Sequence, residues 1–153
     1  MDETCMRRCL ALALSAADSG ETAVGAVVVR DGVIIGEGAE STRRLSDPTA
    51  HAEVVALRAA CGRERTLDLS GCEIHTTVEP CLLCSFAIRR TGVTRVVYGT
   101  PAGQLGGVTS DYAVLVDRAV AGWPPPPEVV SGVLAQECLE MLMKARDRSA
   151  RRG

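Results

Sequence analysis

The spacing of apolar side chains changes from helical to strand-like within the first part of the chain. Between residues 3 and 17, apolar positions recur every three or four residues, which predicts an amphipathic helix. Residues 23–29 are instead small and β-branched, and this pattern resumes over residues 33–35. Between these two runs, Asp31 and Gly32 are typical of a two-residue hairpin turn. The chain is therefore expected to begin with a helix followed by a β-hairpin.

Strand-like and helix-like segments alternate through the rest of the chain. Pro48 discourages a helix before residue 50, and Gly62 is expected to end the helix that follows. Strands are predicted over residues 72–78, 95–98 and 129–130, and helices over residues 51–60, 81–90, 111–121 and 134–148. Because such alternation favours parallel pairing, whereas the hairpin adds an antiparallel pair, we predict an α/β fold. Its expected form is a three-layer α/β/α sandwich with a mixed, mostly parallel sheet.

The composition fits one globular domain. The 153 residues, 46% of them hydrophobic, suffice for one core, so a single domain is expected over residues 1–153. No apolar run approaches the roughly 18 residues that cross a bilayer, so no membrane partner is expected. The acidic N-terminus lacks a signal-peptide pattern, and seven cysteines in such a chain indicate a reducing compartment. We therefore predict a cytoplasmic protein without structural disulfides.

The distribution of charge gives little support for a nucleic-acid partner. The net charge of −2 provides no global attraction to a polyanion. Only the C-terminal stretch is clearly basic, and a flexible basic tail is expected from about residue 146. Cations at a helix C-terminus also suit the helix dipole, so the simpler interpretation is a solvated helix end. One Trp, two Tyr and one Phe leave few surfaces on which unpaired bases could stack.

Two short motifs offer ligands for one metal ion. His51 stands two residues before Glu53, and a proline-preceded pair, Cys81 and Cys84, follows further along the chain. Thiolates and an imidazole at expected helix starts favour zinc, and three ligands leave the fourth tetrahedral position open. Zinc lowers the pKa of a water molecule held there, and a nearby carboxylate can move the proton. The pattern predicts one catalytic Zn²⁺ per chain, with Glu53 as the proton-transfer residue.

Two other interpretations of the cysteine pair are weaker. A closed structural zinc site would need Cys72 or Cys61 as a fourth ligand. The sequence lacks the second ligand pair that structural sites usually show, and this interpretation leaves Glu53 without a role. A thioredoxin-like redox motif would not account for the upstream histidine and glutamate.

The two motifs together form the signature of zinc-dependent deaminases. On these residues the chain resembles the cytidine deaminase superfamily, in the branch of bacterial tRNA adenosine deaminases and guanine deaminases, over nearly its whole length. The resemblance implies hydrolytic deamination of an amino-substituted heterocycle, a five-stranded sheet and a homodimer. It also implies that His51, Cys81 and Cys84 hold the zinc ion. The residues expected around the substrate are Val24, Gly25, Glu40, Ala52 and Asp111.

Two departures from the family pattern bear on the substrate. Members commonly carry an asparagine eleven residues before the zinc histidine, where this chain has Glu40. An amide donates and accepts hydrogen bonds, whereas a carboxylate only accepts them, so Glu40 would favour rings or sugars that offer donors if it faces the pocket. If it does not, it is a solvated loop residue. The tRNA-acting members also carry an acidic residue and a lysine in a segment that corresponds to residues 100–107, which here contain neither.

These observations predict a hydrolase that deaminates a free nucleobase or a related small aminoheterocycle and releases ammonia. Guanine-type rings are preferred over cytosine or adenine, and the main partner is then a small molecule, with tRNA disfavoured. The alternative is a tRNA wobble-adenosine deaminase that binds through the basic C-terminal residues. A third hypothesis is a non-catalytic interaction module stabilised by zinc with four protein ligands.

Overall fold

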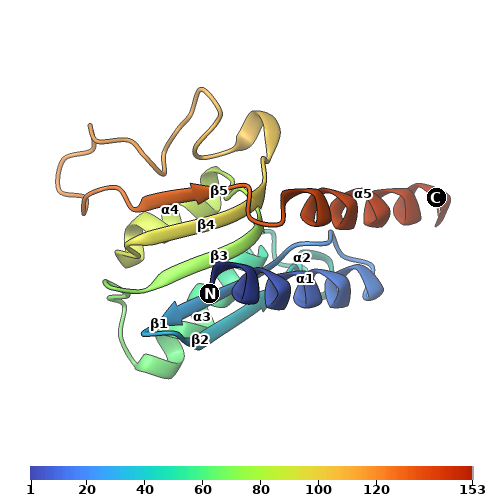
Figure 1. Ribbon diagram of the computed structural model, residues 1–153, viewed down its shortest axis with the longest axis horizontal. Coiled ribbons are helices and arrows are strands. Elements are labelled where there is room, and N and C mark those ends of the chain that lie inside the picture. The colour runs from blue at the N-terminus through green and yellow to red at the C-terminus, as the bar shows by residue number, and fades with distance from the viewer. Residues whose placement is uncertain (153) are drawn as a thin grey trace.

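The computed structural model describes residues 1–152, which are organised around a five-stranded sheet (Figure 1). The strands are β1 (Gly25–Arg30), β2 (Val33–Ala39), β3 (Glu73–Val78), β4 (Arg95–Thr100) and β5 (Glu128–Ser131). Their order across the sheet is β2-β1-β3-β4-β5. β1 is antiparallel to β2 and to β3, whereas the pairs β3–β4 and β4–β5 are parallel. The mixed five-stranded sheet is confirmed, but it is not mostly parallel, because two of its pairs are antiparallel and two are parallel.

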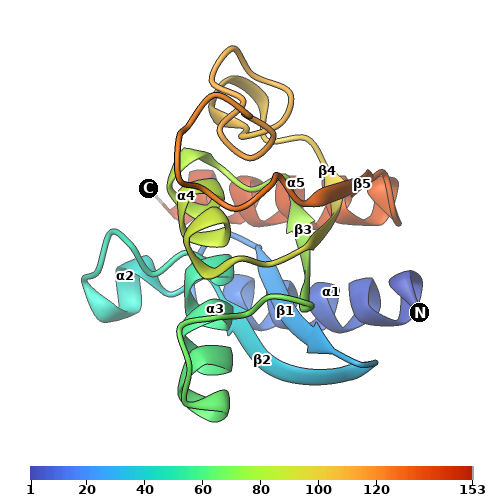
Figure 2. The same cartoon turned by 90° about the vertical axis from the view of Figure 1, so that its left-hand side faces the viewer.

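Helices cover both faces of this sheet, which confirms the three-layer arrangement (Figures 1 and 2). The long helices α1 and α5 pack on one face, and α3 and α4 pack on the other. A short helix α2 precedes α3, and a 3₁₀ turn η1 follows β4. Their bounds are α1 (Asp2–Asp18), α2 (Thr42–Leu45), α3 (Ala52–Glu64), α4 (Leu82–Thr91), α5 (Ala135–Arg152) and η1 (Gly103–Leu105). No helix in the described part of the chain is both long and apolar enough to cross a membrane.

Strand β1 is apolar along its length because both of its faces are buried. Ala26 and Val28 belong to the core beneath α3 and α4, whereas Val27 and Val29 belong to the core beneath α1 and α5. Successive strand residues point to opposite faces, so one continuous apolar run supplies both cores. At the end of β1, Asp31 and Gly32 both adopt positive φ, and Arg30 pairs with Val33, as predicted for the hairpin.

Helix α3 lies unusually close to the sheet, which fixes where its first residue stands. A Cβ atom added at Gly38 of β2 would collide with the backbone of Ala52 and Ala56, and one at Gly36 would collide with Ala56 and Ala60. Only glycine permits this approach. The start of α3 is therefore held against the carboxyl half of β2.

The structure corrects several predicted boundaries. The helix predicted over residues 111–121 is wrong, because this segment forms turns. Its backbone carbonyls serve a different partner: the buried Arg89 guanidinium donates to the carbonyl oxygens of Val114, Leu115 and Asp117. Helix α3 does not stop at Gly62, whose missing side chain would face open space, but continues to Glu64. Arg65, which adopts the left-handed conformation, ends α3.

The C-terminal residues continue a helix in the structure. Residues 146–152, expected as a flexible basic tail, belong to α5, and Gly153 lies outside the described residues. α5 lies beside α1, and ion pairs join the two helices at both ends: Arg7 with Glu137 at 3.2 Å, and Arg148 with Asp18 at 3.4 Å (Figure 1). The basic segment is thus placed along one edge of the molecule.

Candidate active site

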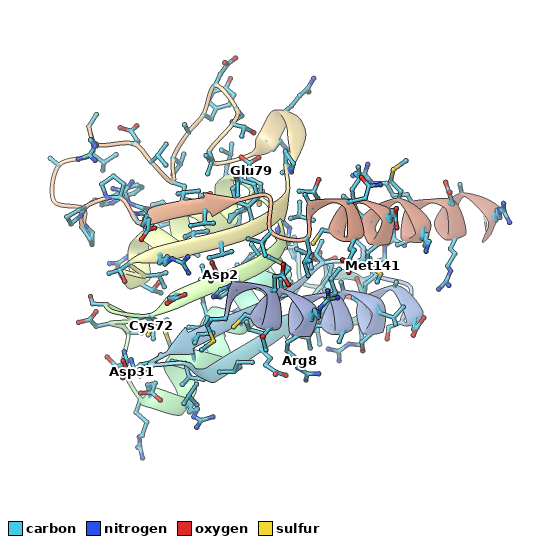
Figure 3. All side chains as sticks on the ribbon, in the orientation of Figure 1. Asp2, Arg8, Asp31, Cys72, Glu79 and Met141 are labelled. Carbon is cyan, nitrogen blue, oxygen red and sulfur yellow. The ribbon has the colours of Figure 1, made fainter. Side chains whose placement is uncertain are left out.

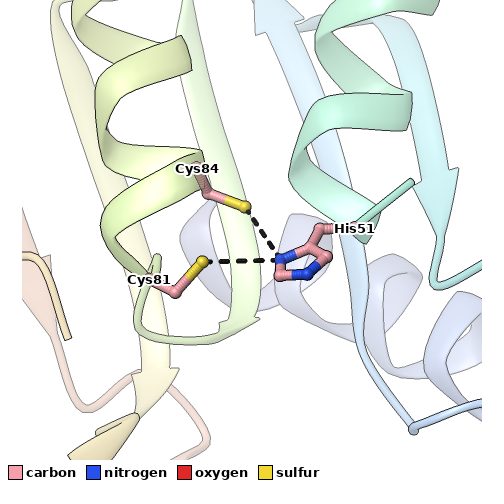
Figure 4. A group of neighbouring side chains, drawn as sticks. All are labelled: His51, Cys81 and Cys84. Carbon is pink, nitrogen blue, oxygen red and sulfur yellow. Dashed lines mark hydrogen bonds between the residues drawn. The ribbon is translucent and has the colours of Figure 1, made fainter. Parts of the chain in front are cut away.

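The ends of two helices bring the predicted metal ligands together. His51 is the residue before α3, and Cys81 is the residue before α4, both with extended backbone. The carbonyl oxygen of each accepts the first helical hydrogen bond, from Val55 and Ser85. Cys84 lies in the first turn of α4, so its thiol faces the same side as that of Cys81. Two unrelated chain segments therefore present all three ligands at one point (Figure 4).

The spacing of the ligand atoms fits a tetrahedral zinc ion. His51 Nδ1 lies 3.4 Å from Cys81 Sγ and 3.5 Å from Cys84 Sγ, and the three ligand atoms all lie within 4.8 Å of one another. Zinc bonds of about 2.0–2.3 Å at tetrahedral angles separate neighbouring nitrogen and sulfur ligands by about 3.6 Å. The predicted set of ligands and the predicted cofactor agree with this geometry, and the cluster fits one Zn²⁺.

Charges within the cluster already favour the metal-binding form of one ligand, the Cys81 thiolate. Hydrogen bonding from Cys84 and the nearby His51 lowers the pKa of Cys81 to about 4. Contact with Cys81 raises the pKa of His51 to about 9. The Cys84 thiol keeps its proton, which it directs at Glu53 Oε2 over 3.4 Å. A dication that binds here is expected to displace protons, because zinc coordinates thiolates and neutral imidazole.

Glu53 lies beside the cluster and is almost completely buried, with 4% of its surface exposed. Its Oε1 accepts a hydrogen bond of 3.0 Å from the Thr76 hydroxyl on β3, which fixes the orientation of the carboxylate. Burial raises the pKa of Glu53 to about 7. A carboxylate held this close to the ligands can exchange a proton with a group at the open coordination position.

The closed structural zinc site does not fit the described structure. Cys72 precedes β3, whereas the metal cluster lies beyond the opposite end of that strand. Cys61 stands ten residues after His51 along α3, a rise of about 15 Å. Both cysteines contribute to the apolar core beneath α3 and α4. The cluster keeps three protein ligands and an open side.

That open side faces a cavity of about 520 Å³. His51, Glu53 and Cys81 form its floor. One wall comes from the loop after β4 and from η1, through Pro101, Ala102, Gly103 and Leu105. A second wall comes from α5, through Leu139, Leu142 and Arg146, which follow helical spacing. The loop after β4 and the C-terminal helix, which lie apart in the sequence, thus form the two walls of the cavity.

The residues predicted around the substrate have different positions. Val24 and Glu40 line the cavity. Ala52 is buried behind it, and its N–H donates to Glu40 Oε2 over 3.3 Å. Gly25 packs against the backbone of α1, and its N–H donates to the Thr77 hydroxyl. Asp111 is exposed and lies beside a separate hollow with Tyr112.

Two groups of cavity residues were not among the predicted site residues. Leu139, Leu142 and Arg146 could not be assigned because only the packing of α5 brings them there. Glu79 also lines the cavity, and it is buried just beyond β3 (Figure 3). An acidic residue directly before Pro80, in a segment that must be buried, was the one available signal.

A second group of potential metal ligands is bound by an arginine side chain. Asp2, Glu73 and His75 also place ligand atoms within 4.8 Å of one another. The Arg95 guanidinium bonds to both carboxylates at 2.8 Å, with two of these bonds to Asp2. His75 is completely buried and lies 3.2 Å from Glu73. This group is therefore a structural ion-pair network that contains a packed histidine.

Comparison with known proteins places this geometry in context. The family model for the cytidine and deoxycytidylate deaminase zinc-binding region matches residues 1–100. The tRNA-specific adenosine deaminase of Haemophilus influenzae is 39% identical over 142 residues, which cover 92% of this chain and 80% of that protein. The corresponding protein of Aquifex aeolicus is 41% identical over 98 residues, which cover 64% of this chain and 65% of that protein. The chain thus spans just under two thirds of the Aquifex relative.

A solved structure agrees with the fold over nearly the whole chain. It comes from a study of A-to-I editing by tRNA:A34 deaminases at the wobble position of transfer RNA. Its TM-score is 0.85 with 34% sequence identity, and the match covers 91% of this chain and 99% of that one. The two chains therefore share the same overall fold.

These relatives overturn two predictions. The expected substrate, a free nucleobase or small aminoheterocycle with guanine-type rings preferred, is wrong, and so is the small molecule as the main partner. The relatives at 39% and 41% identity are named tRNA-specific adenosine deaminases, and the solved structure is that of a tRNA:A34 deaminase. Net charge misled the prediction because it averages over the molecule, whereas Arg146 of α5 lines the cavity itself.

The family assignment is supported by both the sequence match and the geometry of the ligands. The matched residues 1–100 contain His51, Glu53 and both cysteines of the cluster, whose spacing suits zinc. The protein therefore belongs to the family defined by the cytidine and deoxycytidylate deaminase zinc-binding region.

Proposed function

We propose that this protein is a zinc-dependent hydrolase that deaminates adenosine to inosine in tRNA, at the wobble position. The observation that carries the proposal is the buried Glu53 carboxylate beside a three-ligand metal cluster at the floor of an open cavity. The names of the relatives support adenosine in tRNA as the substrate.

The chemistry required of the residues is proton transfer. Deamination adds water across the N1=C6 bond of adenine, with the hydroxyl on C6 and a proton on N1, and then releases ammonia, so adenosine and water become inosine and ammonia. A bound zinc ion would supply the Lewis acidity that makes water nucleophilic near neutral pH. Glu53 would accept the proton of that water, pass it to ring nitrogen N1, and return a proton to the departing amine. The Thr76 hydroxyl holds the carboxylate in place during these transfers.

The walls of the cavity suit a nucleotide that belongs to a larger polyanion. Arg146 lines the cavity, and Lys144, Arg148 and Arg151 have exposed side chains on the last turns of the same helix. Cations in this position can contact the phosphates next to a base that enters the cavity. The basic segment, whose simpler interpretation was a solvated helix end, thereby gains a role in binding tRNA.

The catalytic proposal is tested by replacing the proton-transfer group. Glu53→Gln should fold, bind one zinc ion per chain and release no inosine from a tRNA anticodon stem-loop. Glu140→Gln, a matched change on the exposed part of α5, should retain wild-type activity. Zinc content and circular dichroism establish that both variants are intact. Full inosine formation by the zinc-loaded Glu53→Gln protein would refute the proposal.

The tRNA proposal is tested by the salt dependence of binding. Neutralising Arg146, Arg148 and Arg151 to glutamine should weaken tRNA binding and reduce the slope of log Kd against log salt by up to about 3. The matched control neutralises Arg58 and Arg63, exposed residues of α3, and should leave the slope unchanged. An unchanged slope in the α5 variant would show that this surface does not contact the phosphates.

We further propose that residues 1–153 act as one deaminase domain, in the cytoplasm and as a homodimer. The family resemblance supports the dimer, and seven cysteines that form no disulfide in the described residues support a reducing compartment such as the cytoplasm. Sedimentation of the zinc-loaded protein at micromolar concentration should give twice the mass of one chain. A monomer over the whole concentration range would contradict the dimer.

A further inference from the structure

Glu40 places a second buried carboxylate in the wall of the cavity. It follows β2, and only 9% of its surface is exposed. Glu40 lines the same cavity as His51 and Glu53, and burial raises its pKa. Keeping a carboxylate in this environment costs free energy, so its position calls for a partner.

The hydrogen bonds within the protein leave part of this carboxylate free. Ala52 donates its N–H to Oε2 over 3.3 Å, and the Thr42 hydroxyl donates to Oε1 over 3.2 Å. Both oxygens therefore act as acceptors. A carboxylate offers about four lone-pair positions, so about two remain for a donor that enters the cavity.

An adenosine within an RNA chain has few groups that can meet this requirement. Its ring nitrogens N3 and N7 are acceptors, as is N1 before deamination, and the 3′ and 5′ oxygens are esterified. The remaining donors are the exocyclic N6 amine and the ribose 2′-OH. The amine must lie at the metal cluster next to Glu53, because it is the group that leaves. The 2′-OH is the donor left for the second carboxylate.

We infer that Glu40 accepts a hydrogen bond from the ribose 2′-OH of the target adenosine and thereby selects RNA over DNA. The inference rests on the proposed function and specifies which feature of the substrate is recognised. Neither Glu53 nor Glu79 is available for this role: Glu53 serves the reaction, and four donors already surround Glu79.

A purely structural role for Glu40 makes a different prediction. Its bond to the Ala52 N–H lies at the start of α3, so its loss could simply weaken that helix end. Such a defect would lower stability and zinc content, and it would slow all substrates by the same factor. Recognition of the 2′-OH instead changes the ratio of the rates for two substrates that differ only in that hydroxyl.

The experiment measures this ratio. The two probes are an anticodon stem-loop RNA with adenosine at the target position and the same RNA with 2′-deoxyadenosine at that position alone. Zinc-loaded wild-type protein should favour the ribose probe in kcat/KM by about 10- to 100-fold, as a hydrogen bond to a charged group contributes. Glu40→Ala should reduce the ratio to within about 3-fold of unity, and Glu40→Gln, which keeps one neutral acceptor, should give an intermediate ratio.

Glu21→Gln provides the matched control. Glu21 is equally buried and accepts hydrogen bonds from the backbone of Arg43 and Arg44, but it does not belong to the cavity lining. Its substitution should lower stability without changing the ratio. If Glu40→Ala fails to fold, Glu40→Gln decides between the two roles. An intermediate ratio supports recognition of the 2′-OH, and the wild-type ratio contradicts it.

The outcomes separate the two proposals. A wild-type protein that deaminates both probes equally, or Glu40 variants that keep the wild-type ratio, would overturn the inference while the deaminase function stands. A zinc-loaded wild-type protein that forms no inosine from the ribose probe would overturn the proposed function and this inference with it.

Discussion

Replacing Glu79 should loosen the loop that forms one wall of the cavity. Glu79 accepts hydrogen bonds from the backbone N–H groups of Ala102 at 3.1 Å, Val108 at 2.9 Å and Thr109 at 2.8 Å, and from the Thr109 hydroxyl at 2.7 Å. Burial would raise the pKa of Glu79, but these bonds hold it below its usual value, so the side chain is ionised. Gly106 packs directly on this carboxylate, so a side chain at position 106 would have to displace it from its hydrogen bonds.

The expected loss in the free energy of unfolding follows from the number of acceptor oxygens that the side chain at position 79 offers. A glutamine at position 79 keeps one acceptor oxygen, so its amide group must face either the Ala102 N–H or the pair from Val108 and Thr109. At least one buried N–H is then left without a partner, which costs about 1–3 kcal/mol, and the remaining bonds lose their charge assistance. We expect Glu79→Gln to lower the free energy of unfolding by about 2–4 kcal/mol.

The assay combines stability with kinetics. Urea unfolding of the zinc-loaded protein gives the free-energy change, and steady-state kinetics on a tRNA stem-loop should show KM raised more than kcat is lowered, because the loop residues 101–105 line the cavity. Glu37→Gln breaks only an exposed ion pair with Arg8 and should cost less than about 1 kcal/mol. If Glu79→Gln matches wild type in both stability and KM, the loop is held by other contacts and the reasoning fails.

Three further predictions concern the metal, the packing of α3 and pH. Chelation of zinc should abolish deamination and lower the unfolding midpoint, and added zinc should restore both; activity in metal-free protein would contradict the site. Gly38→Ala should destabilise by at least about 1–3 kcal/mol, whereas Gly62→Ala should stabilise by about 0.5–1 kcal/mol in urea unfolding; equal effects would refute the close approach. The bond to Arg95 lowers the pKa of Asp2, so this pair stabilises above the unfolded pKa of about 3.9, and the effect is lost as pH falls through the lower folded value. Asp2→Asn should cost about 0.5–1 kcal/mol at pH 7 and nothing near pH 2, and a constant difference across this range would disprove it.

Much of the architecture could be predicted because its signals are local. The hairpin at Asp31 and Gly32 depends on two adjacent residues that adopt positive φ easily. The three long helices with apolar stripes, and the strands between them, follow from spacing along the chain. The segment over residues 111–121 was mispredicted because its conformation is set by Arg89, a residue far away in sequence whose guanidinium binds the carbonyl groups a helix would have used.

The sequence by itself determined the chemistry of the metal cluster. His51, Cys81 and Cys84 are a zinc ligand set because of their side-chain types, and their positions before two helices follow from local start signals. One departure from the family pattern, Glu40, could be named from the sequence but not placed, since nothing local states whether a loop carboxylate is buried.

Only the tertiary structure decided what surrounds that cluster. It turned Glu40 into the cavity, fixed the loop over residues 101–105 through Glu79, and brought Arg146 of the last helix to the mouth of the site. The physical reason is that ligand identity resides in individual side chains, whereas a cavity is formed by packing between segments distant in sequence, and no local pattern encodes their contact.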